Sequence, residues 1–262
     1  MELCKGVQNT TDVTPSELMV IVAARELRDK ESVLVGVGIP NLAANLAKKL
    51  QAPNLNMVYE SGAVGSNPTR MPLSIGDPCL VTGAKSICSM YEQFAYYLQG
   101  GRIDVGFLGG AQIDKWGNIN STVIGQYKTP KVRLPGSGGA CDIASNVKKI
   151  IVITPHEKRR FVEKVDFLTS PGFVDGKEKW KQLKLQGGGP YAVITNLCTM
   201  KFDETTGEMT LVSLHPGVTF EKVQENTPWK IKVSETLEHT PPPTEKEITT
   251  LRSLDPKRMY LG

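Results

Sequence analysis

The chain has few of the residue patterns that mark metal-binding or disulfide-stabilised proteins. Its 262 residues include only three histidines, which lie far apart, and five cysteines, none of which forms a C-x-x-C pair. No H-E-x-x-H motif is present, so the sequence predicts neither a metal site nor a disulfide framework. An odd number of scattered cysteines favours a reducing compartment. These cysteines are Cys4, Cys79, Cys88, Cys141 and Cys198.

Long apolar runs and long charged runs are also missing. The longest apolar run near the start, residues 18–24, is far too short to span a bilayer, and no signal-peptide core precedes it. We therefore expect a soluble, cytoplasmic protein that does not bind a membrane. The net charge of +4 comes without a basic block, which disfavours nucleic acid as a partner. The absence of a G-x-S-x-G elbow disfavours serine hydrolase chemistry of that kind.

What the chain does contain is an alternation of strand-like and helix-like hydrophobic patterns. Helices are predicted to begin at Thr14, at Asn41 and at Met90, the first with Glu17 completing a capping box. Buried strands are predicted at residues 32–35, 56–59, 105–108 and 149–154. This rhythm predicts an α/β fold with a mainly parallel sheet and helices on both faces.

The C-terminal third has a different pattern. Short strands are predicted at residues 191–195, 201–202 and 209–214, and a final helix capped by Thr244 follows a proline-rich segment. No internal repeat is visible. We expect residues 1–262 to form a single domain, in which residues 186–262 could make an appendage.

Glu60 is the first candidate for chemistry, because it follows the predicted strand at residues 56–59. Ligands of parallel sheets bind beyond the carboxyl ends of the strands. An ionised carboxylate can attack an activated acyl group such as a thioester. The small residues that follow it, S-G-A in the sequence, would let a bulky ligand approach. On these residues alone, a solvated glutamate at a strand end is the simpler interpretation.

Two glycine-rich turns are the other candidates. The segment GVGIP at residues 36–40 joins a strand to a helix, so its backbone N–H groups could bind a phosphate or an oxyanion. The segment GSGGA at residues 136–140 has three glycines in four positions, which allows close approach of a ligand. A tight turn without a ligand explains the first segment equally well, and the spacing of a dinucleotide site fails in the second, which disfavours NAD.

Several other polar residues are weaker candidates. Cys141, beside the second glycine turn, could be a nucleophile, although a packed thiol is the simpler role. His156 could contact phosphate, although a surface position at a strand end is more common. Arg70, Lys128 and Arg133 could each pair with a distal carboxylate of a substrate or be ordinary surface charges.

Taken together, the segments resemble the catalytic β subunit of family I CoA-transferases, and most closely that of glutaconate CoA-transferase. The resemblance extends from about residue 15 to residue 262. Besides the region around Glu60, it is carried by FLGGAQIDKWGNINS at residues 107–121, PGSGGACDIAS at residues 135–145 and HEKRRFVEKVDFLTSPGFVDG at residues 156–176.

The resemblance implies a fold, a set of site residues and a partner. The fold would be that of the CoA-transferases, shared in outline with ribose-5-phosphate isomerase. Glu60 would be the catalytic glutamate, the N–H groups near Val37 and Gly38 would form an oxyanion hole, and the second glycine turn would contact the CoA thioester. The contacting residues of that turn would be Gly136, Gly138, Gly139 and Ala140.

The resemblance also implies that coenzyme A esters are substrates, with no tightly bound cofactor. A separate α subunit would complete the active site near the subunit interface, in an α2β2 or larger assembly. Glu60 favours transfer of CoA between carboxylic acids, of which one could be a dicarboxylate such as glutaconate. Hydrolysis or decarboxylation of acyl-CoA on the same fold is the alternative, and a regulator that binds CoA esters without turnover is a third.

Overall fold

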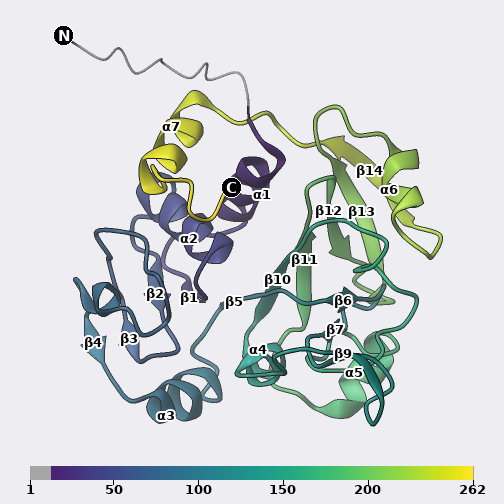
Figure 1. The fold of residues 1–262 in the computed structure, drawn as a ribbon, viewed down its shortest axis with the longest axis horizontal. Coiled ribbons are helices and arrows are strands. Elements are labelled where there is room, and N and C mark those ends of the chain that lie inside the picture. Colours follow the sequence, from purple (N-terminus) through teal and green to yellow (C-terminus); the bar gives the residue numbers. More distant parts are fainter. Residues whose placement is uncertain (1–12, 262) are drawn as a thin grey trace.

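A computed structural model describes residues 13–261, and its centre is one ten-stranded sheet (Figure 1). From one edge to the other, the strands are β14 (Lys232–His239), β13 (Met209–Leu214), β12 (Cys198–Phe202), β11 (Pro190–Ile194), β10 (Lys149–Ile153), β5 (Val105–Leu108), β1 (Ser32–Leu34), β2 (Asn56–Val58), β3 (Ala63–Val64) and β4 (Ser86–Ile87).

The five central strands of this sheet, β11-β10-β5-β1-β2, are all parallel. Antiparallel pairs extend the sheet through β12 and β13 on one side and through β3 and β4 on the other, and β14 pairs parallel with β13. Leu34 of β1 pairs with Val58 of β2, so the loops after these two strands leave the sheet at the same edge. The mainly parallel sheet predicted from the sequence is confirmed.

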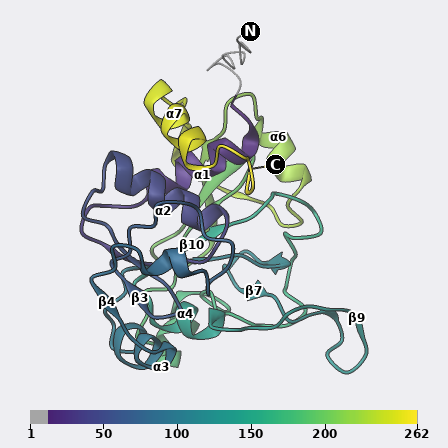
Figure 2. The same ribbon diagram turned by 60° about the vertical axis from the view of Figure 1, so that its left-hand side comes forward.

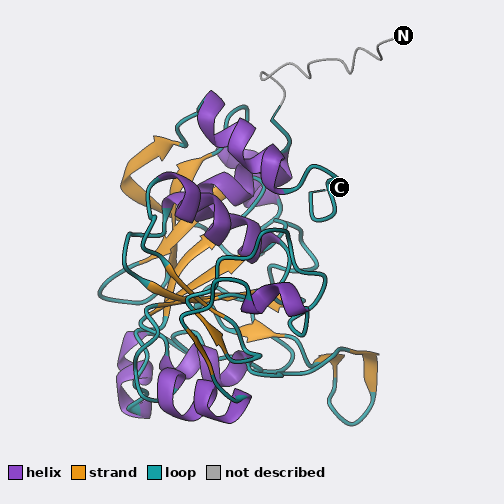
Figure 3. Ribbon diagram, turned by 90° about the vertical axis from the view of Figure 1, so that its left-hand side faces the viewer, coloured by secondary structure: helices purple, strands orange, loops and turns teal. Residues whose placement is uncertain are grey.

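Helices cover both faces of the sheet (Figure 3). On one face lie α1 (Pro15–Arg25), α2 (Ile39–Leu50) and α7 (Glu245–Leu254); on the other lie α4 (Ala140–Asn146) and the π-helix η2 (Gln93–Leu98), which continues α3 (Met90–Glu92). The strands alternate accordingly: Val33 and Met57 pack with the first group, while Leu34 and Val58 pack with the second. Both faces are therefore apolar, as burial on two sides requires.

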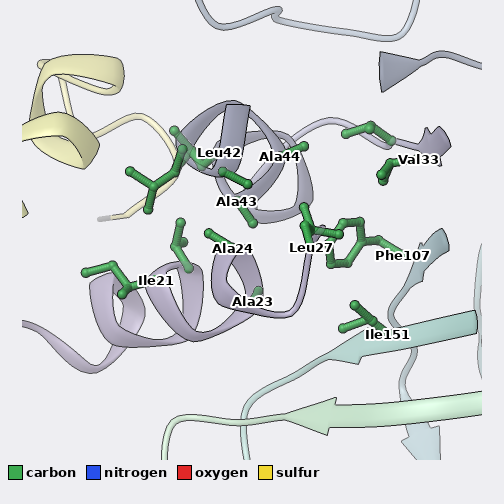
Figure 4. Packing of buried hydrophobic residues seen from close by; sticks show 14 of the residues in the cluster. Ile21, Ala23, Ala24, Leu27, Val33, Leu42, Ala43, Ala44, Phe107 and Ile151 are labelled. Carbon is green, nitrogen blue, oxygen red and sulfur yellow. The ribbon is translucent and has the colours of Figure 1, made fainter. Parts of the chain in front are cut away.

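The packing of α1 against α2 explains why α1 is apolar nearly all round. Small residues on the two helices, among them Ala23, Ala24, Ala43 and Ala44, bring the helices close together, and Phe107 and Ile151 of the sheet complete the cluster (Figure 4). Full burial of one such large side chain contributes about 1.5–3 kcal/mol. The predicted capping box is present, because Thr14 accepts from the Glu17 N–H at 3.2 Å and Glu17 accepts from the Thr14 N–H at 2.9 Å.

The remaining elements, apart from η1, come between β5 and β14 along the chain. They are η1 (Pro78–Val81), β6 (Gln112–Ile113), β7 (Ile119–Asn120), β8 (Val123–Gly125), β9 (Pro130–Arg133), α5 (Lys177–Leu183) and α6 (Phe220–Glu225). The β8–β9 hairpin extends away from the body of the molecule (Figure 2).

The C-terminal third continues the same sheet rather than building a separate one. Strands β12 to β14 extend the sheet beyond β11, the last strand of the parallel core, and α7 returns to pack against α1 and α2 (Figure 1). The predicted strand at residues 201–202 is longer than expected and begins at Cys198. The sequence did not predict β14, because its residues KVSETLEH are mostly exposed and polar, as is usual on a sheet edge.

Candidate active site at the carboxyl edge of the parallel strands

Glu60 lies on the tight turn that joins β2 to β3. The Gly62 N–H donates to the Tyr59 carbonyl at 2.9 Å, and the Tyr59 N–H donates to the Ala63 carbonyl at 2.9 Å. Gly62 has a φ of +103°, and a Cβ at this position would lie 1.8 Å from the Cys88 carbonyl oxygen. Only glycine fits there, so the glycine two residues after Glu60 has a structural reason that is independent of catalysis.

The carboxylate of Glu60 is half-buried and packs against the second glycine turn. A Cβ built on Gly139 would lie 3.1 Å from Glu60 Oε1 and 2.6 Å from Phe94 Cζ. Among residues 13–261, no side chain or backbone N–H donates a hydrogen bond to this carboxylate. Burial without a partner raises the pKa of Glu60 above its usual value of 4.5. Once ionised, such a carboxylate is weakly solvated and therefore a better nucleophile.

The first glycine turn leaves the same edge of the sheet as Glu60. Gly38 has a φ of +93°, which only glycine adopts readily, and its carbonyl accepts from the N–H groups of Asn41 and Leu42 in the first turn of α2. Within the described part of the chain, no group accepts from the N–H of Val37 or of Gly38. Free N–H groups at the positive end of a twelve-residue helix suit an oxyanion or a phosphate.

The second glycine turn is fixed at its base and open toward solvent. Ser121 holds Gly136 by two bonds, because its carbonyl accepts from the Gly136 N–H at 2.8 Å and its hydroxyl donates to the Gly136 carbonyl at 2.9 Å. Gly136 and Gly138 have φ values of +100° and +50°, and a Cβ on either would meet nothing within 4 Å. Ala140 then begins α4. The structure therefore brings Gly139 into contact with Glu60 and leaves Gly136 and Gly138 facing open space.

Two residues beside these turns were not found from the sequence. Phe94 comes from the π-helix η2, an irregular helix type that occurs often at functional sites. Tyr260 comes from the C-terminal segment; its hydroxyl donates to the Pro72 carbonyl, and its ring would lie 3.9 Å from a Cβ on Gly38. The π-helical geometry has no simple sequence signal, and Tyr260 is remote in sequence from the turn that it touches.

Two expectations about single side chains were wrong, and a third residue, Arg70, has a partner on this chain. His156 is buried rather than on the surface: its Nε2 lies 2.9 Å from the Thr227 hydroxyl and its ring stacks on Phe161. Burial lowers the pKa of His156 to about 4, so it is neutral near pH 7 and unsuited to phosphate. Cys141 is exposed rather than packed. Arg70 forms a two-fold hydrogen-bonded pair with Asp77, at 2.8 Å for each contact.

The other candidates for a distal carboxylate lie in the β8–β9 hairpin. Arg133 donates to the Tyr127 carbonyl at 3.0 Å and covers the Tyr127 ring, while Lys128 is exposed. Cys4 lies outside the described residues. Across residues 13–261, no group of three His, Cys, Asp or Glu side chains is arranged to hold a metal ion. No helix in this part of the chain is long and apolar enough to cross a membrane.

Comparison with known proteins gives a consistent result. Residues 17–226 match the coenzyme A transferase family model. The chain is 49% identical over 240 residues to the β subunit of 3-oxoadipate CoA-transferase from Pseudomonas knackmussii, with 92% of each chain covered. It is 36% identical over 259 residues to the β subunit of glutaconate CoA-transferase from Acidaminococcus fermentans, with 96% of each covered.

A solved structure agrees with these sequence matches. The crystal structure of the Acidaminococcus fermentans glutaconate coenzyme A-transferase superimposes with a TM-score of 0.90 at 35% identity, covering 96% of this chain and 98% of the other. The chain therefore belongs to the coenzyme A transferase family. Within that family it is an enzyme subunit of the β type, similar to those of glutaconate and 3-oxoadipate CoA-transferases. The family predicted from the sequence is confirmed, and the 3-oxoadipate relative shares more residues with the chain than the glutaconate relative does.

Proposed function

We propose that this subunit carries the nucleophile of a CoA-transferase that moves coenzyme A between an acyl-CoA and a carboxylic acid through a thioester on Glu60. The observation that supports this proposal is the position of the Glu60 carboxylate. It is half-buried, it has no hydrogen-bond donor within residues 13–261, and it packs against Gly139 at the strand edge from which the Gly38 turn also leaves.

The chemistry follows in balanced steps. A Glu60 carboxylate oxygen attacks the thioester carbonyl and the C–S bond breaks. The CoA thiolate departs, and the acyl group stays on the enzyme as a mixed anhydride with Glu60. The thiolate then attacks the Glu60 carbonyl carbon, and the first carboxylic acid departs as its carboxylate. The acceptor carboxylate repeats both steps in reverse. No net oxidation, reduction or hydrolysis takes place, and coenzyme A esters are substrates rather than bound cofactors.

The two glycine turns have distinct roles in this proposal. Each step passes through a tetrahedral oxyanion, for which the N–H groups of Val37 and Gly38 are the proposed donors; losing one such donor costs on the order of 3 kcal/mol. Gly136, Gly138, Gly139 and Ala140 form the wall along which the thioester end of CoA approaches Glu60. Phe94 and the Glu60 carboxylate both lie beside Gly139, so we expect the aromatic ring to limit the access of water to the anhydride on that side.

The substrate acids are proposed from the relatives. Glutaconate and 3-oxoadipate, for which the two relatives are named, are both dicarboxylic acids. We therefore propose a dicarboxylate as one substrate of this enzyme. Arg70 is engaged with Asp77 and Arg133 with the Tyr127 carbonyl, so the exposed Lys128 is the better candidate on this chain for the distal carboxylate.

A separate α subunit is the proposed partner, because both relatives are themselves single subunits of a larger enzyme. The α subunit would complete the site in an α2β2 or larger assembly. Its surface would cover the open side of the glycine turn at residues 136–140, where Gly136 and Gly138 meet nothing within 4 Å.

An isotope-exchange assay tests the proposed reaction. When the assembled enzyme is mixed with an acyl-CoA and the labelled form of the same acid, label should enter the acyl-CoA. No different acceptor acid is needed, because each half-reaction is reversible by itself. Glu60→Ala should reduce this exchange by about 10⁴-fold or more. Glu204→Ala, which replaces an exposed glutamate in a hairpin, is the matched control and should exchange at the normal rate. Full activity of Glu60→Ala, or continued turnover of acyl-CoA beyond one equivalent per site with no acid present to accept CoA, would contradict the proposal.

A further inference from the structure

Tyr59, the residue before Glu60, is fully buried, and its hydroxyl forms a hydrogen bond that has no direct part in the proposed transfer of CoA. Its backbone forms both hydrogen bonds that close the Glu60 turn, to Gly62 and to Ala63. Its hydroxyl donates to Asn41 Oδ1 at 3.1 Å. Burial raises the pKa of Tyr59, so the phenol keeps its proton and remains a donor at any pH at which the protein works.

Asn41 connects this phenol to the first glycine turn. It is fully buried in the first turn of α2, and its own N–H donates to the Gly38 carbonyl at 3.0 Å. Asn45 Nδ2 donates to Asn41 Oδ1 at 2.6 Å and to the Asn41 carbonyl at 2.9 Å, which fixes the orientation of the Asn41 amide. An unbroken set of hydrogen bonds thus runs from the Glu60 turn, through Tyr59 and Asn41, to Gly38.

A buried polar chain of this kind is not the most stable way to pack two turns. The Nδ2 group of Asn41 has no acceptor among residues 13–261 although it is buried. An unsatisfied donor in an interior is unfavourable for folding, so apolar residues of similar shape would pack with less penalty. The polar residues therefore contribute something other than stability, and the two turns that they join are those of the proposed nucleophile and of the proposed oxyanion donors.

We propose that Tyr59 and Asn41 are positioning residues that hold the Glu60 carboxylate at a fixed place relative to the N–H groups of Val37 and Gly38. This inference rests on the proposed function and adds to it. Attack on a thioester needs the carboxylate on one side of the carbonyl carbon and the donors at its oxygen, so a small displacement of one turn lowers the rate. Both side chains are fully buried, so we expect substrate binding to be unchanged when they are replaced.

The test is the rate at which the assembled enzyme forms the Glu60 thioester when it is mixed with an acyl-CoA in a single turnover. The reaction is quenched at intervals, reduced with borohydride and analysed by mass spectrometry of the Glu60 peptide. Tyr59→Phe keeps the ring and removes only the hydroxyl. We expect it to slow thioester formation about tenfold or more and to lower kcat in parallel, with KM for the acyl-CoA unchanged within about twofold.

Two further variants make the test decisive. Tyr191→Phe is the matched control, because it also removes a hydroxyl from a partly buried tyrosine, here on β11. The Tyr191 hydroxyl accepts from Lys201 Nζ at 3.2 Å, and this variant should form the thioester at the normal rate. Asn45→Ala releases the Asn41 amide, leaves the Tyr59 hydroxyl in place and suits a helix interior, so it decides the question if Tyr59→Phe does not fold. We expect Asn45→Ala to slow thioester formation in the same way.

The possible failures are distinguishable. If the unmodified enzyme forms no adduct on Glu60, the proposed function fails and this inference fails with it. If the unmodified enzyme forms the adduct, and Tyr59→Phe or Asn45→Ala forms it at the normal rate, only the positioning role is overturned. A variant with a lower melting temperature and a normal rate of adduct formation likewise assigns these residues a purely structural role.

Discussion

At the scale of single residues, the surroundings of Glu60 set its protonation more than its sequence neighbours do. The carboxylate packs against Gly139, which comes from a loop far along the chain, and no described residue donates to it. Desolvation therefore acts without compensation and raises the pKa of Glu60 from 4.5. A protonated carboxyl group is not a nucleophile, so this shift has a direct consequence for activity.

The pH dependence of kcat/KM should show this shift. Because the reactive form is the ionised one, activity should fall as pH decreases, with a single-proton midpoint above 4.5. Steady-state rates of the assembled enzyme between pH 4 and 8 would measure the midpoint, with circular dichroism at each pH to confirm that the protein stays folded. A profile that is flat to below the usual pKa of a glutamate, or that rises toward acid, would contradict a nucleophilic carboxylate at this position.

The sequence predicted the position of Glu60 but not the environment of other single side chains. A buried strand followed by a turn gave its place at the sheet edge, because strand ends can be read from hydrophobic pattern. His156 follows a strand in the same way, yet it is enclosed by Phe161, Thr195 and Thr227. Thr195 and Thr227 come from segments distant along the chain, so the sequence around His156 does not reveal its burial.

At the scale of elements, the glycines of the two turns separate into those that the backbone requires and those that it does not. Gly38 has a φ of +93°, whereas Gly36, two residues earlier, lies outside the left-handed region, and a Cβ added to it would have nothing within 4 Å. The sequence predicted both as parts of one turn. Only the backbone conformation shows that they are not equivalent.

Replacing these two glycines provides a matched comparison. Gly38→Ala should lower the free energy of unfolding by about 1–3 kcal/mol, because it forces a side chain into the left-handed region. It should also reduce kcat about tenfold or more, since relaxation of the turn moves the Val37 and Gly38 donors. Gly36→Ala should change the free energy of unfolding by less than about 0.5 kcal/mol. Urea titration and steady-state kinetics measure both effects, and equal effects of the two substitutions would refute the distinction.

Two elements differ from the sequence prediction, because the hydrophobic pattern of their residues does not determine their conformation. The helix from Met90 to Leu98 was predicted as one piece, and the structure divides it into a short α-helix and a π-helix that carries Phe94. The strand β14 has few apolar residues because it lies at the sheet edge. Both depend on neighbours in space rather than on hydrophobic periodicity along the chain.

At the scale of the whole molecule, ion pairs join helix α7, near the C-terminus, to helix α1, near the N-terminus. The buried Glu17 of α1 pairs with Arg252 of α7, with Nε and Oε1 2.9 Å apart, and Arg25 pairs with Glu247 at 2.7 Å. Beyond α7, Tyr260 reaches the Gly38 turn and Leu261 joins the core. The sequence predicted the capped helices α1 and α7 but gave no indication that they meet, because the contact joins opposite ends of the chain.

The pair between Glu17 and Arg252 should contribute more than an exposed pair. Arg252→Met leaves a carboxylate that is 1% exposed with Arg258 at 3.9 Å and the Thr14 N–H as partners, and should lower the free energy of unfolding by about 1–3 kcal/mol. Lys181→Met removes a partner of the exposed Glu178 and should cost less than about 1 kcal/mol. Urea titrations of both variants at neutral pH make the comparison. A cost for Arg252→Met as small as that for Lys181→Met would show that α7 is not held in this way.

The covalent intermediate is the central claim, and trapping it is the most direct test. The assembled enzyme is incubated with an acyl-CoA and no acceptor acid, reduced with borohydride, digested and analysed by mass spectrometry. A glutamyl thioester is reduced to an alcohol, so the peptide that contains Glu60 should lose the mass difference between a carboxylic acid and an alcohol, and only when acyl-CoA was present. An unmodified Glu60 peptide in an enzyme that still turns over, or a modification at another residue, would contradict the account.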